Sequence, residues 1–506
     1  MQNGTPTRNS PPKSYWIAFF CLCFFLGLSG AEAQVKAAGA CLADEYSGKD
    51  AGSKISAAIA DAKCNTIDAT KITGAQSAAT PITIGRPVAV LLGDITLSVS
   101  DKKAIDIKSP EGKVSIVGIP GKTRIVNSTG ASPGPASAMI IADYLGNPQA
   151  ADITIRNLTL DGGGNSNPAN CYKRGIVLRN VTRATVEGNS ITGIAVPAAG
   201  PGDAYSINFD DHVTDSKILN NTISGTPGTF NDHGYRMGIL IQSKMVDGYN
   251  GLVNGTPRLP ATTSGILIQG NQVTGGTHGI NLQNVSHVQV INNQATDQGH
   301  RNLIIYATSD HILVRDNTLK NAGSVNLLFD FGIDEIEIVH NVMDTTIGAE
   351  GDNIEGYLLV SHVNIHDNVM SNAALSGIKI AGHAKWVDIK ANKISNFCNA
   401  AQAAGILVEG AMSGGYTTLA SGELLQSVNV SGNTITKQGT CAGNRPSYGV
   451  QVLGKQPGTK MGDVPMTGIL IENNTFDGVA SDVAMHQNGD AAAWDVKTGK
   501  NTFIHH

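Results

Sequence analysis

The chain has 506 residues, of which 59 are Gly, 15% are charged and 5% are aromatic, with a formal net charge of −5. Disordered chains are charge-rich and poor in aliphatic residues, and collagen has Gly at every third position, so this composition excludes both. A weakly acidic chain without a block of Lys or Arg also lacks the basic footprint of a nucleic-acid-binding protein. Many glycines with few charges and few aromatic residues favour a long, repetitive β structure.

The first 33 residues have the pattern of a secretory signal peptide. Arg8 and Lys13 precede an apolar run over residues 15–28, and Ala31-Glu32-Ala33 provides a processing site. The alternative is an N-terminal membrane anchor, but a membrane span needs about 20 apolar residues. We therefore predict that residues 1–33 are removed and that the mature protein, free of the membrane, is secreted, periplasmic or at the cell surface.

A helix is predicted next, within an N-terminal segment over residues 34–75. In residues 53–62, Ile55, Ala58, Ile59 and Ala62 follow the spacing of one apolar helix face. A stacked-repeat protein exposes a hydrophobic end that needs a cap, and we predict that this helix is the cap.

One short pattern recurs from about residue 150 onward: aliphatic, any, aliphatic, any, any, Asn, any, aliphatic. Its shortest intervals are 22 and 24 residues, and such regular phasing is typical of a repeat architecture. The recurring residues are Asn189, Asn221, Asn271, Asn293, Asn317, Asn341, Asn368, Asn392, Asn433, Asn474 and Asn501.

A second short strand precedes each Asn, as in residues 175–178, 279–282, 377–380 and 405–408, each led by Gly. Their apolar residues alternate with period two, which indicates strands with one buried face. Three short strands per turn of 22 to 24 residues predict an all-β fold, a single right-handed parallel β-helix of roughly 12 coils over residues 76–506. The Asn is expected in a tight turn with left-handed backbone geometry, its side chain stacked into an amide ladder along the axis.

Five cysteines remain after signal removal, and an oxidising compartment makes disulfides the default. Cys398 lies six residues after Asn392, and Cys441 lies eight residues after Asn433. These positions fall in nearly the same turn of adjacent coils, about 5 Å apart, which suits a disulfide.

The remaining cysteines are Cys41, Cys64 and Cys171. Cys41 and Cys64 bracket the cap helix, and we predict that they join. Cys171 is left over and is expected to be buried rather than reactive. None of the five forms a C-x-x-C pair, so a zinc ribbon or thioredoxin motif has no support.

The run over residues 50–62, continued by residues 66–69, resembles the N-terminal head of the pectate lyase-like superfamily. With the repeats, the resemblance covers roughly residues 45–505. That superfamily includes secreted polysaccharide lyases, family 28-type glycoside hydrolases, epimerases and phage tailspikes. The resemblance is specific for the fold and weak for the reaction; it implies a polysaccharide partner and admits Ca²⁺ as a cofactor.

Long coil insertions mark the side of the β-helix where a cleft is expected, because loops on a rigid scaffold carry function. Three inserts, over residues 245–264, 411–427 and 455–467, fall between a Gly-led strand and the next Asn strand, and another spans residues 226–236. We predict that they flank the outer face of the Gly-led strands.

Two outward positions per Gly-led strand can be read from the alternation. One column is predicted to contain Arg179, Asp210, Gln242, Gln283, Tyr306, Asp330, Glu409 and His486. The other is predicted to contain Asn208, Leu240, Asn281, Ile304, Leu328, Leu358, Lys379, Leu407 and Gln451. The apolar middle of the second column is expected to be covered by a loop or by another subunit, which would make the protein an oligomer.

The polar groups gather on the N-terminal coils, and there we place the candidate active site. The predicted catalytic residues are Asp210, Asp211, His212 and Tyr205, and the predicted substrate-binding residues are Arg179, Asn208, His233, Arg236, Gln242 and Lys244. Cations would neutralise the carboxylate of a uronate and acidify its C5–H, and His212 or Tyr205 would act as acid or base. The structural alternative is that Asp and His satisfy backbone groups of a turn while Arg179 pairs with Asp210. His278 and His300, beside turns, are expected to be structural.

The subfamily motifs are incomplete in this chain. Family 28 hydrolases place an Asp pair, His-Gly and Arg-x-Lys on nearby coils; here the Asp pair and His278-Gly279 occur, but Gly377 replaces the Arg before Lys379. Lys379 is also expected about five coils, or about 24 Å, beyond Asp210. The Tyr-Gly-x-Asp-Pro-His run of mannuronan epimerases resembles residues 205–212 only loosely, with Asp211 replacing Pro. No metal-ligand set is assigned, since only Asp210 and Asp211 qualify clearly as neighbouring carboxylates.

We therefore predict a secreted polysaccharide-active enzyme, by preference a lyase or epimerase acting on a uronate-containing glycan. Three features support this prediction: the signal peptide, the outer face flanked by long inserts, and the cluster of charged residues on the N-terminal coils. The alternatives are a non-catalytic glycan-binding or surface-scaffold β-helix and a polygalacturonase-like glycoside hydrolase.

Overall fold

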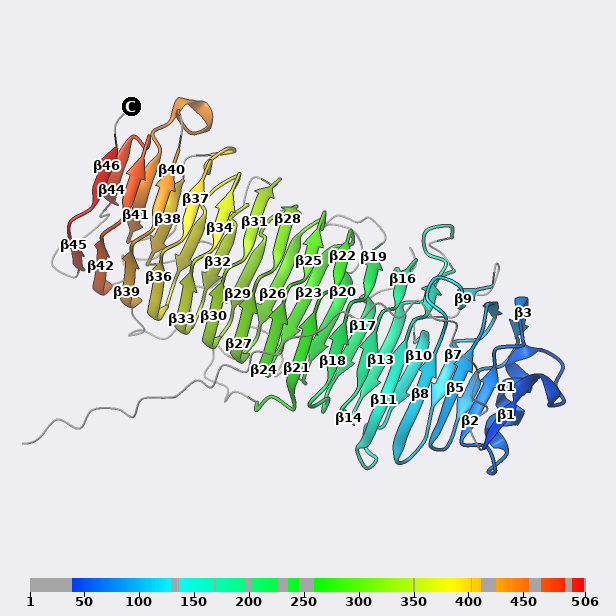
Figure 1. Cartoon of the computed structure of the whole chain (residues 1–506). Coiled ribbons are helices and arrows are strands. Elements are labelled where there is room, and N and C mark those ends of the chain that lie inside the picture. Colours follow the sequence, from blue (N-terminus) through cyan, green and yellow to red (C-terminus); the bar gives the residue numbers. More distant parts are fainter. Residues whose placement is uncertain are drawn as a thin grey trace, which may run out of the picture. The chain divides into compact units, whose positions relative to one another are not determined.

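The computed structural model describes residues 39–504 apart from 129–133, 135, 168–169, 197–201, 226–234, 245–258, 349–350, 402, 411–424, 438, 455–465 and 487–493. Within this part of the chain, the strands form three long sheets in which each strand pairs in parallel with its equivalent one coil along. Figure 1 shows the successive coils stacked from the blue end of the described chain to its red end. The predicted parallel β-helix is confirmed. No described helix is long and apolar enough to span a membrane.

The first sheet contains the strands that precede the recurring Asn. Its 17 described strands are β1 (Ala40–Leu42), β2 (Thr66–Ala69), β5 (Val88–Leu92), β8 (Gly112–Val117), β11 (Ala150–Arg156), β14 (Val181–Thr182), β15 (Thr185–Glu187), β18 (Lys217–Leu219), β21 (Thr263–Gln269), β24 (Val285–Ile291), β27 (Asp310–Arg315), β30 (Asp334–Val339), β33 (Ser361–His366), β36 (Lys385–Lys390), β39 (Leu425–Ser431), β42 (Met466–Glu472) and β45 (Trp494–Thr498).

The second sheet contains the Gly-led strands. Its 14 described strands are β4 (Ile82–Ile84), β7 (Lys103–Ile107), β10 (Ala138–Asp143), β13 (Arg174–Arg179), β17 (Ala204–Asp210), β20 (Arg236–Gln242), β23 (His278–Gln283), β26 (Arg301–Tyr306), β29 (Leu327–Asp330), β32 (Ile354–Tyr357), β35 (Ile378–Ala381), β38 (Ala404–Glu409), β41 (Tyr448–Leu453) and β44 (Ser481–His486).

The third sheet contains the short strands that follow the Asn. Its 15 described strands are β3 (Gly74–Ala78), β6 (Ile95–Val99), β9 (Arg124–Asn127), β12 (Thr159–Asp161), β16 (Ser190–Thr192), β19 (Thr222–Ser224), β22 (Gln272–Thr274), β25 (Gln294–Thr296), β28 (Thr318–Ala322), β31 (Val342–Thr346), β34 (Val369–Ser371), β37 (Lys393–Ser395), β40 (Thr434–Thr436), β43 (Thr475–Asp477) and β46 (Thr502–Ile504).

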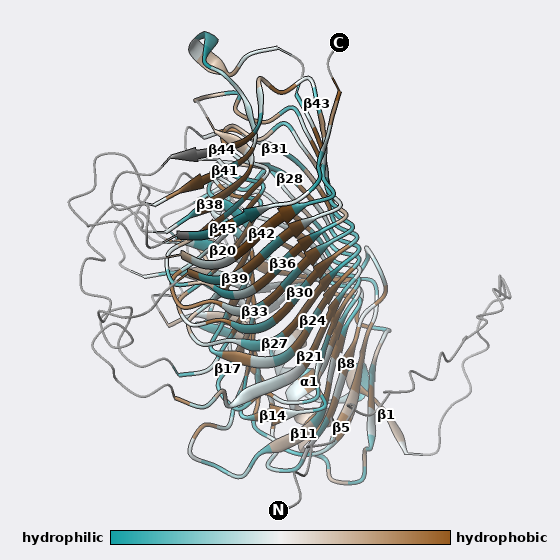
Figure 2. Cartoon of the chain, turned by 90° about the vertical axis from the view of Figure 1, so that its left-hand side faces the viewer, coloured by the Kyte–Doolittle hydropathy of each residue, from teal (hydrophilic) through white to brown (hydrophobic). Residues whose placement is uncertain are grey.

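The core runs along the inside of the coils, because the inward residues of all three sheets are aliphatic. In the second sheet one inward column contains Ile105, Ile140, Ile176, Ile207, Ile239, Ile280, Leu303, Leu327, Ile354, Ile378, Ile406 and Val450, all nearly fully buried. Figure 2 shows the hydrophobic segments of neighbouring coils side by side. A side chain therefore meets its equivalents on the coils above and below.

The recurring Asn residues form a continuous buried ladder, as predicted. The backbone N–H and the Nδ2 of Asn293 both donate to Oδ1 of Asn317, at 2.9 and 3.0 Å, and Asn317 donates in the same way to Asn341. The Nδ2 of Asn317 also donates to the carbonyl of Val290 on the preceding coil, at 2.8 Å. The same bonds recur at every step from Asn189 to Asn501.

The left-handed geometry lies one residue earlier than predicted. It belongs to the residue before ten of the eleven ladder Asn, all except Asn501, with φ between +52° and +68°: Gly188, Asn220, Gly270, Asn292, Asp316, His340, Asp367, Ala391, Gly432 and Asn473. This residue reverses the chain direction, which leaves the ladder Asn free to turn its amide inward. Most of these positions hold Gly, Asn, Asp or His, the residues that tolerate this geometry best.

The solenoid is slightly longer than the roughly 12 coils predicted, because the N-terminal coils lack the ladder Asn. On the coil before Asn189, Leu158 occupies the ladder position, and its N–H donates to Oδ1 of Asn189 at 3.1 Å. Strands β1 to β12 carry the same three-sheet pattern without an amide ladder.

The helix α1 (Ala51–Ala60) packs on the first coil, and its apolar face, including Ile55 and Ile59, belongs to the common core. Asp50 and Ser53 form a reciprocal capping box at its start. At its end, Arg86 donates to the carbonyl of Ile59 at 2.6 Å. Two 3₁₀ turns, Ala43–Glu45 and Ala442–Asn444, complete the described helical structure.

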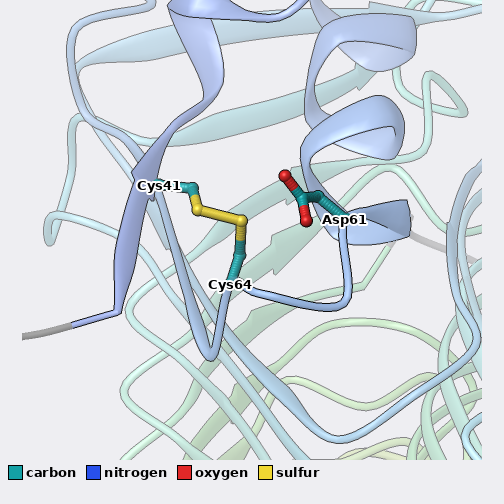
Figure 3. A group of neighbouring side chains, drawn as sticks. All are labelled: Cys41, Asp61 and Cys64. Carbon is teal, nitrogen blue, oxygen red and sulfur yellow. A yellow bond between two sulfur atoms is a disulfide. The ribbon is translucent and has the colours of Figure 1, made fainter.

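Both predicted disulfides are present. Cys41 joins Cys64 with a Cα–Cα distance of 5.5 Å, and Asp61, at the end of α1, lies beside this bond (Figure 3). Cys398 joins Cys441 across adjacent coils with a Cα–Cα distance of 5.1 Å. Cys171 is buried, as expected.

We expect Asn317→Ala to lower the free energy of unfolding by about 3 kcal/mol or more. It removes the Oδ1 that accepts two buried donors of Asn293, and each buried donor left unpaired costs about 1–3 kcal/mol. Denaturant unfolding monitored by circular dichroism measures the change. Asn364→Ala, on the outer side of β33, is the control and should change it by less than about 0.5 kcal/mol; equal losses for both variants would mean that the ladder contributes nothing specific.

We expect Ala391→Gly to stabilise the protein by about 1 kcal/mol. Ala391 has a φ of +53°, a geometry that costs a residue with a Cβ about 1–2 kcal/mol and costs Gly nothing. The buried Ala384, which does not have a positive φ, is the control, and Ala384→Gly should destabilise instead. Melting temperatures that shift in the same direction for both variants would contradict this account.

Candidate functional site

The outer face of the second sheet has the side-chain columns that the alternation predicts, with one correction. The column through Asp210 runs Asp143, Arg179, Asp210, Gln242, Gln283, Tyr306, Asp330, Tyr357, Ala381, Glu409, Leu453 and His486. In the second column, the position between Leu328 and Lys379 belongs to Glu355 rather than Leu358. Leu358 lies in the turn after β32, with a φ of +60°.

Six residues at the carboxyl ends of neighbouring strands form what we call the carboxyl-end cluster: Asp143, Arg179, Asp210, Asp211, His212 and Gln242. The Arg179 guanidinium contacts Asp210 through two of its nitrogens, one at 2.9 Å, and contacts Asp143 at 3.2 Å. Gln242 donates to the other oxygen of Asp210 at 2.9 Å. The pair of Arg179 and Asp210 that the structural alternative predicted is therefore present, as part of a chain of contacts across four strands.

His212 is the most exposed member of this cluster, and Asp211 lies beside it. Nδ1 of His212 lies 3.1 Å from Oδ1 of Asp211, and half of the His212 side chain is exposed. Thr262 also donates to Asp211. Asp211 thus lies beside an imidazole, the side chain that most often serves as a general acid or base in enzymes.

The same two residues have a structural role, because both are left-handed, with φ of +52° and +57°. Two consecutive left-handed residues recur at the same turn on later coils, at 307–308 and 358–359. Asp and His tolerate this geometry better than most residues. The turn therefore accounts for part of the predicted motif.

The structure does not bring all of the predicted residues together. Tyr205 lies at the start of β17, five residues and about 17 Å along the strand from Asp210, and its hydroxyl is 3.5 Å from Asp203. Burial raises the pKa of Tyr205, so its hydroxyl stays protonated and cannot act as a base. Arg236 likewise lies at the start of β20, away from the carboxyl-end cluster.

The other predicted binding residues have separate surroundings. Asn208 lies between Tyr205 and Asp210 on the same outer face, and its buried amide donates to the carbonyl of Leu240 at 3.3 Å. Lys244 is exposed just after β20. His233 and most of the four predicted inserts lie outside the described residues.

The family motifs do not converge either. Lys379 lies on β35, six strands from Asp210 and thus about 29 Å away, farther than predicted. Aligned without a gap from Tyr205, the Asp and His positions of the epimerase motif fall on Asn208 and Asp210. Neither position holds the residue type of the motif.

A second group, which the sequence analysis did not assemble, lies on the middle coils of the same face. This middle-coil cluster comprises Asp330, Asp352, Glu355, Tyr357, Lys379 and Glu409. Nζ of Lys379 lies 3.0 Å from Glu355 and 4.0 Å from Glu409. Tyr357 lies close to Asp330, and Asp352 accepts a hydrogen bond from the N–H of Ser376 at 2.6 Å.

Burial dominates the electrostatics of the middle-coil cluster. Asp330 and Glu409 are each 1% exposed, and burial raises the pKa of Asp330 to about 8 and that of Glu409 to about 7. Burial likewise raises the pKa of Asp352 to about 7. Burial alone would lower the pKa of Lys379, but the carboxylates around it raise it, Glu355 most of all. These shifts are of the kind that occur at functional sites.

The register at β32 hid this cluster in the sequence, because Glu355 rather than Leu358 faces outward there. The predicted second outer column placed Leu358 next to Lys379, so Glu355 was not expected on the outer face beside Lys379. The Gly356 that follows Glu355 lies inward against the ring of Phe329. Gly356 interrupts the aliphatic alternation, and its inward position is apparent only from the ring beside it, so no local sequence signal placed Glu355.

Ile304 and Leu328, the apolar residues of the second outer column, are buried in a cluster with Phe331, Tyr357 and Leu358. The ring of Phe331 meets those of Tyr306 and Tyr357 edge to face, with centroids 5.0 and 6.0 Å apart. Three aromatic side chains on three consecutive coils thus border the middle-coil cluster.

His278 and His300 form a buried pair, with Nε2 and Nδ1 3.0 Å apart. Burial lowers the pKa of His300 to about 3 and lowers that of His278 as well. Both rings are therefore neutral at physiological pH. This supports the expected structural role.

Two groups of described residues could offer three metal-ligand atoms each. Cys41, Asp61 and Cys64 form the first, but their sulfurs are joined in the disulfide of Figure 3. The second is an exposed group on the first sheet, His287, Asp310 and His311, whose imidazoles stack nearly parallel with centroids 4.4 Å apart. Parallel rings do not direct their in-plane lone pairs to one point, so we assign no metal to this group.

The carboxyl-end cluster does not fit Ca²⁺, the cofactor that the superfamily resemblance admits. Calcium requires six to eight oxygen ligands. Asp210 already accepts from Arg179 and Gln242, and Asp211 from Thr262. The carboxylates of this cluster therefore lack the free oxygen atoms that a calcium ion would need.

An open groove with a volume of about 490 Å³ lies apart from both clusters. It is lined mainly by small residues after the third-sheet strands, including Gly225, Gly275 and Gly299. It presents few groups for chemistry and we assign it no role.

No family model matches this chain, and no curated protein matches it either. Solved structures do match. The A-module of mannuronan C-5 epimerase AlgE6 from Azotobacter vinelandii aligns over 92% of this chain and 99% of its own, with a TM-score of 0.51 and 14% identity. The fold is the right-handed parallel β-helix. The AlgE4 A-module (TM-score 0.49, 15% identity, 90% of this chain and 99% of its own) and the Streptococcus pneumoniae adhesin PfbA (0.47, 12%, 88% and 100%) are also similar to this β-helix. The fold that the sequence resemblance implied is thus confirmed.

We expect the stability of this β-helix to fall as the pH rises from about 4 to about 8. The pKa of Asp330 is near 4 in an unfolded chain and about 8 in the folded one, so the folded state holds the extra proton in this range. The stabilisation is complete below pH 4 and is lost as the pH rises through 8. Urea unfolding at several pH values measures it, and Asp330→Asn should flatten the slope; an unchanged slope in that variant would show that Asp330 does not hold the proton.

Proposed function

We propose that this protein is an exported polysaccharide-active enzyme that acts on a uronate-containing glycan as a lyase or an epimerase. The observation that carries the proposal is the Asp211–His212 dyad at the open edge of the carboxyl-end cluster. An imidazole beside a carboxylate is the kind of pair that serves as a general acid or base in enzymes. Its half-exposed side chain can be reached by a polymer, whereas the buried acids of the middle-coil cluster cannot be reached without rearrangement.

The chemistry required is removal of the C5 proton of a uronate. His212 would take up this proton, and Asp211 would stabilise the imidazolium that forms. The Arg179 guanidinium, shared between Asp143 and Asp210, lies on the neighbouring strand, where it could exchange a carboxylate partner for that of the sugar. Elimination and epimerisation share this first step and differ in whether the leaving group departs or a proton returns.

The outward columns of the second sheet support the proposed substrate site. Arg179, Asp210 and Gln242 face outward in one column at the strand spacing of about 4.8 Å. An extended glycan can lie across these strands and form hydrogen bonds with successive side chains. The two disulfides support export, because such bonds persist in oxidising compartments.

A second candidate, a non-catalytic glycan-binding β-helix, is favoured by one specific observation. The left-handed turn at Asp211 and His212 recurs where no chemistry is expected, at 358–359. On this view, Asp211 and His212 are present only because Asp and His tolerate the left-handed backbone of the turn. The protein would in that case bind glycans through its outer face without turning them over.

A panel of polysaccharides separates these possibilities. Absorbance at 235 nm detects the unsaturated uronate of a lyase, and deuterium incorporation from D₂O into an intact polymer detects an epimerase. New reducing ends without absorbance indicate a hydrolase instead. Binding without any of the three products indicates the non-catalytic protein.

On the substrate so identified, His212→Ala should lower turnover by about 10²-fold or more, the contribution of a general acid–base group. The matched control is His340→Ala, because His340 is also exposed and left-handed, with a φ of +54°, but precedes a ladder Asn on another turn. Both variants should lose similar stability, and only the first should lose activity. Asp210→Asn, which removes charge and keeps size, should also lower turnover; full activity in His212→Ala would remove the dyad from the mechanism.

A further inference from the structure

The middle-coil cluster lies on the same outer face as the carboxyl-end cluster and in line with it. Asp210 and Asp330 occupy the same outward column four strands apart, a separation of about 19 Å. A glycan extended along this column from one cluster would reach the other. Gln242, Gln283 and Tyr306 are the residues between them.

Two carboxyl oxygens in the middle-coil cluster are buried without a hydrogen-bond partner. They are Oδ1 of Asp330 and Oε1 of Glu409, and each residue is 1% exposed. An unsatisfied buried polar atom is costly, and native structures rarely keep one without a reason. A sugar hydroxyl would supply the missing donor, and it can also accept from a carboxyl group that holds a proton.

The surroundings also suit a sugar ring. Ligand sites combine apolar and aromatic walls with a few polar groups that fix orientation. Tyr306, Phe331 and Tyr357 provide the aromatic wall, and Leu328 extends it. The half-buried Tyr306, together with Glu355 and Lys379, whose side chains are 12% and 13% exposed, forms the edge that meets solvent.

The charges decide what kind of sugar fits. The cluster holds four carboxyl groups: Asp352, Glu355 and Glu409 surround the ammonium of Lys379, and Asp330 interacts with Arg301. A uronate would bring a fifth carboxylate into a buried site where the cation is already paired. Burying an unpaired charge is far more costly than burying a hydroxyl group.

We propose that the middle-coil cluster is a binding subsite for an uncharged sugar residue, with Asp330 and Glu409 accepting and donating hydrogen bonds to its hydroxyl groups. The inference rests on the proposed function, and it names the substrate class: a heteropolysaccharide with neutral sugars within about 19 Å of the uronate that reacts. Because the two oxygens are closed to solvent, binding requires the side chains at the edge of the cluster to move aside.

Isothermal titration calorimetry with neutral hexasaccharides (fragments of glucan, mannan, galactan and xylan) and with oligouronates tests this subsite. At least one neutral fragment should bind the mature protein. Asp330→Leu and Glu409→Leu should each weaken that binding about tenfold or more, as expected when a hydrogen bond to an ionisable group is lost. Each variant replaces a buried carboxyl group that has one unsatisfied oxygen by an apolar group of similar size. Lys379 keeps Glu355 as its partner at 3.0 Å, so both variants should remain folded.

Tyr306→Ala, at the edge of the cluster, provides a second route and should also weaken neutral-fragment binding. Glu337→Leu, which removes a carboxylate from the outer side of β30 in the first sheet, is the control and should bind normally. His212→Ala should also bind neutral fragments normally, so a failure of the proposed catalysis can be told apart from a failure of this subsite. The inference is overturned if no neutral fragment binds or if neutral-fragment binding survives both leucine substitutions. It is also overturned if these substitutions weaken the binding of oligouronates instead.

Discussion

The shared side-chain oxygen of the Asn ladder is the contact that fixes the rest of this β-helix. Each ladder Oδ1 accepts from both the backbone N–H and the side-chain amide of the Asn one coil before, as between Asn293 and Asn317. Because two donors with fixed geometry meet one acceptor, a coil cannot shift along its neighbour by one residue without leaving buried donors unpaired. Since such a shift would also move every side chain to the opposite face, the ladder determines which residues are inside.

Once the register is fixed, the outer columns follow. The second sheet places equivalent outward residues about 4.8 Å apart on successive strands, so a chain of contacts such as Asp143, Arg179, Asp210 and Gln242 can run across four coils. The same regularity places Glu355 beside Lys379 and brings Glu409 to it from the next strand. Polar groups more than 100 residues apart in sequence thereby lie on one continuous face.

The two clusters on this face differ in their relation to solvent, and that difference separates their proposed roles. The imidazole of His212 is half exposed and lies 3.1 Å from Asp211, so the proposed proton transfer places the reacting sugar at the open edge of the sheet. Asp330 and Glu409 are closed from water and keep unsatisfied oxygens, which suits recognition of hydroxyl groups rather than an encounter with a second carboxylate. A substrate with both charged and neutral sugars would use each cluster for what its environment permits.

The sequence by itself determined the solenoid, its ladder, its cap helix and both disulfides, because each depends on residues that recur or lie at fixed offsets within one coil. It also predicted the contact between Arg179 and Asp210, which follows from alternation on adjacent strands. Only the tertiary structure decided that Tyr205 and Asp210 lie at opposite ends of β17, and that Glu355 rather than Leu358 faces outward on β32. A Gly at position 356 interrupts the aliphatic pattern there, and the inward position is recognisable only from the Phe329 ring that fills the space beside it. The burial that raises the pKa of Asp330 likewise depends on Tyr306, Phe331 and Tyr357. These residues come from three consecutive coils, and no local sequence pattern brings them together.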